Sequence, residues 1–271
     1  MNLVQAELFK LRTTSLWWIF AIILVPLWAA SLLLNWASEN AQAGPGVGDD
    51  GAPTETVART ASEVAANLYT SGQFFGVLLV LLLSAIIVTN EFFHLTATTT
   101  FLVTPRRERV ILAKFVAAIV AGLVAWALIT VLDLIFVPII LHQLDFGAEL
   151  GNGAVWRAIG LNALAFVLWS VLGVGAGVLI RSQIAATLTL SILYVVGTQA
   201  IALIFYLLSE YVWKWIEHLQ VLVPTSASEL MISGIDLPGD PPRWLGAVVL
   251  IGYALVTGVL GTVLTKRRDI S

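Results

Sequence analysis

The chain contains no cysteine, only three histidines and few charged residues. Without cysteine it can form no disulfide, and it has no thiolate to offer to a metal or a substrate. His94, His142 and His218 lie far apart in sequence, so we expect no metal site. Charged residues make up 11% of the chain, whereas soluble domains carry roughly 25%. The composition therefore argues against a soluble globular protein.

The sequence also lacks three motifs of well-known catalytic sites. It has no Gly-x-x-x-x-Gly-Lys-Ser/Thr, so it cannot bind and hydrolyse ATP through a P-loop. It has neither His-Glu-x-x-His nor Gly-x-Ser-x-Gly, the signatures of zinc proteases and of many serine hydrolases. We therefore expect that the chain is not an enzyme by itself and that it holds no cofactor.

Most of the chain is apolar. Apolar residues form 59% of the chain, and its mean hydropathy is +0.92. A helix needs about 20 apolar residues to cross roughly 30 Å of hydrocarbon. Six segments qualify, near residues 15–37, 71–90, 113–141, 156–180, 184–208 and 244–265. The sequence thus predicts an all-α integral membrane protein with six transmembrane helices in a single domain, residues 1–271.

Lysine and arginine are sorted between the two sides of the predicted bundle. Of the 14, ten lie on the side that holds both termini: Lys10, Arg12, Arg106, Arg107, Arg109, Lys114, Arg181, Lys266, Arg267 and Arg268. The positive-inside rule therefore places both termini in the cytoplasm. Residues 39–66 fall on the other side, and their Gly-, Pro- and acid-rich composition predicts a flexible external loop.

A polar stretch from Glu91 to Lys114 separates the second and third apolar segments. In its first half, aromatic and aliphatic residues alternate with polar ones, which is typical of an amphipathic element at a membrane surface. Pro105 then interrupts the pattern, and basic residues lead into the third segment.

This stretch resembles the cytoplasmic segment of the permease subunit of a type-2 ATP-binding-cassette (ABC) exporter. The matching residues are Glu91, Phe92, His94, Thr96, Thr104, Pro105, Arg107, Arg109, Ala113 and Lys114. Phe93 and Leu95 depart from the pattern, in which a basic residue and a glycine are common. The resemblance implies a cytoplasmic coupling helix after span two that docks into a groove of a separate ATPase subunit. It implies that the docking residues are Glu91, Phe92, His94, Thr96, Arg107 and Arg109.

The resemblance continues along nearly the whole chain. It implies an N-terminal elbow helix in residues 1–14, although a solvated N-terminus is equally compatible with that segment. It also implies an external helical hairpin between spans five and six. By the same resemblance, two copies, as a homodimer or a heterodimer with a similar permease, form the substrate path. Two P-loop ATPase subunits supply ATP and magnesium, and the location is a bacterial inner (plasma) membrane. We expect contact with membrane lipid and none with nucleic acid.

Polar and small residues inside the predicted spans are candidates for other roles. Asp133 is the acid that lies well inside a span, where it costs about 2.5–3.5 kcal/mol. With Asn162 and Gln199 it is a candidate for the substrate path, or else it is a neutral packing residue. Gly173 and Gly177 share one helix face, which favours close helix packing.

Two other functions are compatible with these residues. A stand-alone secondary transporter would carry protons through Asp133. A membrane-embedded lipid-modifying enzyme would need Asp133 and His142 as acid and base, but on one straight helix they lie roughly 13 Å apart along the axis.

Overall fold

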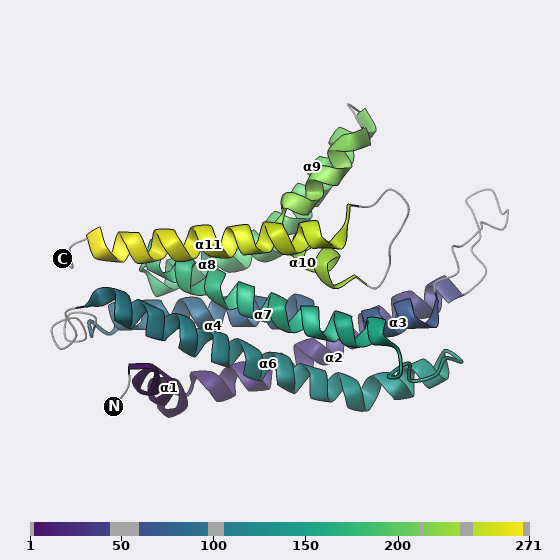
Figure 1. Ribbon diagram of the computed structural model, residues 1–271, viewed down its shortest axis with the longest axis horizontal. Helices are drawn as coiled ribbons and strands as arrows, with labels where there is room; N and C mark the ends of the chain where they lie inside the picture. Colours follow the sequence, from purple (N-terminus) through teal and green to yellow (C-terminus); the bar gives the residue numbers. More distant parts are fainter. Residues whose placement is uncertain (1–2, 44–59, 97–105, 212–213, 234–240, 268–271) are drawn as a thin grey trace.

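A computed structural model shows the chain as a bundle of helices (Figure 1), and it describes residues 3–43, 60–96, 106–211, 214–233 and 241–267. Within these ranges there is no strand, and six helices are long and apolar enough to cross a membrane. The predicted class, an all-α multi-pass membrane protein, is therefore confirmed.

The described elements are all helical. In chain order they are α1 (Leu3–Thr13), α2 (Leu16–Ala43), α3 (Ala61–Leu68), α4 (Gln73–Phe93), α6 (Arg107–Gln143), α7 (Gly153–Ile180), α8 (Gln183–Ile192), the π-helix η1 (Leu193–Gly197), α9 (Thr198–Tyr211), the 3-10 helix η2 (Lys214–Leu222), α10 (Pro224–Ile232) and α11 (Arg243–Arg267). Span one is α2, span two is α3 with α4, span three is α6 and span four is α7. Span five runs from α8 through α9, and span six is α11.

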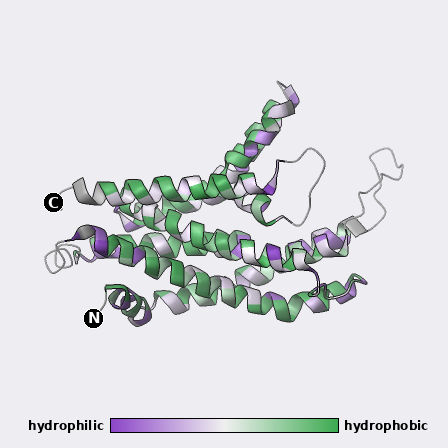
Figure 2. Ribbon diagram, in the orientation of Figure 1, coloured by the Kyte–Doolittle hydropathy of each residue, from purple (hydrophilic) through white to green (hydrophobic). Residues whose placement is uncertain are grey.

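The two termini lie at the same end of the bundle, which we name the α1 end (Figure 1). The opposite end, where α3 and α10 lie, is named the α10 end. Apolar residues cover the long helices, and hydrophilic ones gather where α4 ends and α6 begins, at the α1 end (Figure 2). Span five differs from the others, because α9 leans away from the rest of the bundle (Figure 1).

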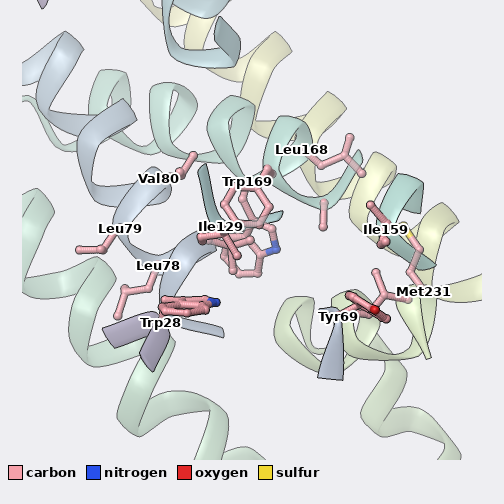
Figure 3. Packing of buried hydrophobic residues seen from close by; sticks show 14 of the residues in the cluster. Trp28, Tyr69, Leu78, Leu79, Val80, Ile129, Ile159, Leu168, Trp169 and Met231 are labelled. Carbon is pink, nitrogen blue, oxygen red and sulfur yellow. The ribbon is translucent and has the colours of Figure 1, made fainter. Parts of the chain in front are cut away.

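The centre of the bundle is the contact between α4 and α7. A Cβ atom added to Gly173 would collide with the backbone oxygen of Leu81, and one added to Gly177 would lie 2.8 Å from the backbone oxygen of Ala85. Both glycines therefore lie directly against the α4 backbone. Buried apolar side chains from spans one to four fill the space toward the α10 end (Figure 3).

The predicted external loop, residues 39–66, is helical at both of its ends, which corrects that prediction. At its far end Thr60 and Glu63 form a capping box that starts α3. Val64 and its neighbours then pack into the core, so burial holds this short helix in place. The middle of the segment, residues 44–59, lies outside the described residues.

Span five and the segment after it depart from regular α-helix. A π-helical turn, η1, separates α8 from α9, and the described segment after span five begins with the 3-10 helix η2. Pro224 then begins α10, where a proline fits because the first helical N–H needs no partner. Five residues of α10 are buried, so this short helix packs into the bundle.

Candidate functional site at the α1 end

Four charged side chains from three helices meet at the α1 end of the bundle. Glu7 and Lys10 come from α1, Glu91 from the last turn of α4 and Lys114 from the first turns of α6. We name these four residues the charge cluster. Two positive and two negative groups balance each other, as buried charges require.

Lys114 is the buried centre of the charge cluster, with 1% of the residue exposed. Its Nζ donates to Glu7 Oε2 at 2.8 Å and to the backbone oxygen of Ile87 at 3.2 Å, and it lies 3.0 Å from Glu91 Oε1. An ammonium group has three hydrogens to donate. The three oxygens around Lys114 thus match its full donor capacity.

Lys10 closes the charge cluster from the surface side. Its Nζ donates to Glu7 Oε1 at 2.6 Å and to Glu91 Oε1 at 2.7 Å. Glu7 therefore offers one carboxylate oxygen to each lysine, while one oxygen of Glu91 faces both. Every member contacts two others, so the charge cluster joins α1, α4 and α6 at one point.

Charge pairing decides the ionisation of the two residues on α1. Burial alone would raise the pKa of Glu7, but Lys114 and Lys10 outweigh it and hold that pKa below its ordinary value of 4.5. Burial alone would lower the pKa of Lys10, but its bonds to Glu7 and Glu91 hold that pKa above its ordinary value of 10.5. Both residues are therefore charged at neutral pH.

The residues after Glu91 form an exposed surface beside the charge cluster. Phe92 is half-buried, and the Arg181 guanidinium lies 5.5 Å from its ring centroid. His94 and Thr96 are exposed, and the Thr96 N–H donates to the backbone oxygen of Glu91 at 2.9 Å. The chain leaves α4 through this turn.

The rest of the predicted docking segment is described in part. Residues 97–105, where the coupling helix is predicted, lie outside the described residues. Arg107 begins α6, although its side chain is not among the described ones. Arg109 is exposed, and the next residue, Val110, is buried. Thus, of the six predicted docking residues, Glu91 lies in the charge cluster while His94, Thr96 and Arg109 face outward.

The three residues predicted for the substrate path differ in their burial. Asp133 and Asn162 are buried in α6 and α7, whereas Gln199 is exposed on α9. Among the described residues, no hydrogen bond joins any two of the three. The described part of the chain also contains no group of three or more acidic or histidine side chains placed to hold a metal ion.

Sequence reasoning missed the roles of Glu7, Lys10 and Lys114. Glu7 and Lys10 interrupt the apolar face of residues 1–14, and a charged pair on an apolar face needs partners when that face is buried. That interruption was the available signal. Their partners lie more than 80 residues away along the chain, so periodicity could not identify them.

At the α10 end a second polar group joins α10 to the bundle. The Ser228 hydroxyl accepts hydrogen bonds from Gln73 Nε2 at 2.5 Å and from Trp169 Nε1 at 3.3 Å. Thr225 and Thr198 also form a hydrogen bond, at 3.0 Å between their hydroxyl oxygens. Spans two, four and five thus hold α10 by its polar side chains.

No known family model matches this chain, and no curated protein is significantly similar to it.

Proposed function

We propose that this chain is the permease subunit of an ATP-driven exporter, with ATP hydrolysis on a separate P-loop ATPase. The observation that carries the proposal is the charge cluster. It ties the end of span two and the start of span three to α1, directly beside the stretch that resembles an ATPase-docking segment. A force applied to that stretch would act on three helices at once, because the ion pairs join them. Separating the pairs would leave uncompensated buried charges, which is costly.

In this proposal the α1 end faces the cytoplasm. Four basic residues belong to the α1 end of the bundle, as the positive-inside rule requires of a cytoplasmic face: Lys10, Arg12, Arg109 and Arg181. The helix α1 serves as the elbow helix, lying before span one and held by the charge cluster. The segment η2 with α10 serves as the external hairpin at the opposite face.

The ATPase contacts the exposed part of the docking stretch. His94, Thr96 and Arg109 are exposed and make that contact, whereas Glu91 acts from inside by fixing the end of span two. Two ATPase subunits, each with ATP and magnesium, serve two copies of the chain. Those copies are identical or similar, and they form the substrate path in the inner membrane of a bacterium.

Co-purification tests this proposal. The tagged chain, isolated from its own membranes in mild detergent, is expected to bring down a stoichiometric partner that carries Gly-x-x-x-x-Gly-Lys-Ser/Thr, identified by mass spectrometry. The variant His94→Ala/Thr96→Ala/Arg109→Ala should lose that partner while its six spans stay folded.

The matched control is Arg157→Ala, an exposed arginine at the opposite end of the bundle, which should keep the partner. A folded wild-type chain that purifies without any ATPase would contradict the proposal. Equal recovery of the partner with the triple variant would contradict the docking surface.

The second candidate function is a stand-alone proton-coupled transporter. The observation that favours it is the complete burial of Asp133 within span three, since buried acids in membrane helices often serve as proton carriers. It predicts transport that persists when every ATPase is removed and that is lost in Asp133→Asn. The lipid-modifying enzyme has less support, because Asp133 is buried while His142 on the same helix is exposed.

A further inference from the structure

A second buried charged residue lies far from the charge cluster. The helical rise puts Asp133 roughly 28 Å from Lys114 along α6, toward the α10 end. Its side chain is fully buried, at 0% exposure. An acid at such a site must be paired, hydrated or neutral.

The carboxyl group of Asp133 has a single hydrogen-bond partner among the described residues. Trp28 Nε1 donates to its Oδ1 at 2.6 Å, and its Oδ2 is buried with no partner. An ionised carboxylate would keep a full charge here against one neutral donor. A neutral carboxylic acid leaves only an ordinary polar group unsatisfied, which costs far less than a bare buried charge.

The neighbours of Asp133 supply no compensating positive charge. Tyr69 is the titratable group close enough to interact with it, but the Tyr69 hydroxyl donates to the backbone oxygen of Ala148 at 2.9 Å. The other charged groups on helices packed against α6 are engaged elsewhere or exposed. Glu7, Lys10 and Glu91 belong to the charge cluster, Glu39 accepts from Asn67, and Glu63 caps α3. Arg157 is exposed, and the partly buried Arg243 on α11 makes an interaction of its own.

Packing holds the Trp28 indole in the position that meets Asp133. A Cβ atom added to Gly72 would lie 2.9 Å from Trp28 Cδ1, and the Phe136 ring centroid lies 5.4 Å from that of Trp28. Figure 3 shows the indole lying beside Leu78 in the core. These contacts hold the Trp28 N–H toward Asp133.

We propose that Asp133 is a proton-binding site inside the membrane domain, and that its neutral carboxyl ties span one to span three through Trp28. Loss of the proton leaves a charge that the packed site cannot hold, so Trp28 and Asp133 must separate or water must enter. The inference concerns this site alone and holds whatever the chain transports.

Infrared spectroscopy of the purified protein in lipid bilayers tests the proposal. At neutral pH the wild-type spectrum should contain the carbonyl stretch of a protonated carboxyl group that is absent in Asp133→Asn. The control Asp145→Asn removes an exposed acid just beyond the same helix, so it should lose carboxylate bands and keep the Asp133 carbonyl.

A second variant tests the hydrogen bond. Trp28→Phe should keep the protonated band but shift it to higher frequency, because Oδ1 loses its donor. This shift is read against wild type, so it stays informative even when Asp133→Asn does not fold. A carboxylate band assigned to Asp133 at neutral pH, or a carbonyl band that Trp28→Phe leaves in place, would overturn the proposal.

Discussion

Leu95 follows the end of α4 in a backbone conformation that suits glycine. Its φ of 56° is left-handed, the position after a helix where glycine avoids the clash of a Cβ atom. Its side chain is 82% exposed and therefore packs little.

Replacing Leu95 with glycine should therefore stabilise the protein. We expect Leu95→Gly to raise the free energy of unfolding by about 1 kcal/mol, since the left-handed strain is removed. Thermal unfolding in detergent, followed by circular dichroism, measures it. Leu112→Gly is the matched control, because Leu112 is also exposed but lies inside α6. That control should destabilise the protein. A loss of stability in Leu95→Gly would contradict the argument.

Lys114 is the residue on which the charge cluster depends most. Lys114→Met should lower the free energy of unfolding by about 3–5 kcal/mol, because Glu7 and Glu91 are left with Lys10 alone. The double variant Lys114→Met/Glu7→Gln restores the charge balance and should recover part of the loss. Melting temperatures of both variants in the same detergent measure the effect. A double variant less stable than the single one would show that packing, not charge, dominates.

Among the elements, α4 and α7 can approach closely only where glycine is present. Gly173→Ala should lower the free energy of unfolding by roughly 1–3 kcal/mol, because the added methyl group meets the backbone of α4 and the helices must separate. Gly160 lies on the same helix with no atom within 4 Å of an added Cβ. Gly160→Ala should therefore stabilise by roughly 0.5–1 kcal/mol. The melting temperatures of the two variants test this prediction. Equal changes in Gly173→Ala and Gly160→Ala would contradict the close contact.

The attachment of α1 should depend on pH at both extremes. The pKa of Glu7 lies below 4.5, so its contribution is present above pH 4.5 and is lost as pH falls through the lower folded value. The pKa of Lys10 lies above 10.5, so its contribution is present below pH 10.5 and is lost as pH rises through the higher folded value.

A spin label on Phe9→Cys, an exposed position of α1, reports this attachment in a chain without other cysteines. The label should stay ordered between these two limits and become mobile outside them. The same label with Glu7→Gln should already be mobile at neutral pH. An ordered label in that variant would mean that apolar contacts alone hold α1.

The sequence predicts the long helices better than the contacts between them. Six apolar runs set the spans, because each run must cover the same thickness of hydrocarbon. The sequence predicts a loop where α3 forms, because its capping box lies in an acid-rich stretch. The charge cluster was missed because Glu7, Glu91 and Lys114 meet only after three helices have packed. Asp133 was found, because an acid within an apolar run is conspicuous, but its partner Trp28 was not.

At the scale of the whole molecule, span five has the most uncovered surface. In its apolar 18-residue window only 6% of the residues are buried, against 72% in that of span two. Gln199 is exposed on α9 among apolar side chains, and a lipid-facing glutamine is unfavourable. We therefore expect span five to face the second copy in the proposed dimer, which would bring Gln199 to the path between the copies.

Cross-linking measures that arrangement. Val196→Cys, exposed beside Gln199, should form a covalent dimer in membranes with a short bifunctional reagent. Leu33→Cys on span one is similarly exposed and should react much less. The chain has no cysteine of its own, so every cross-link reports the introduced residue. Comparable dimer yields at both positions would argue against span five as the interface.

The π-helical turn of span five has a consequence for how its two halves face their surroundings. A π turn bonds residue i to i+5, so it contains one residue more than an α turn. One residue corresponds to about 100° of rotation in an α-helix. The side chains of α9 are therefore turned by about a quarter of the circumference from where a continuous α8 would carry them. The π turn at Leu193–Gly197 therefore sets the direction in which Gln199 points relative to the side chains of α8.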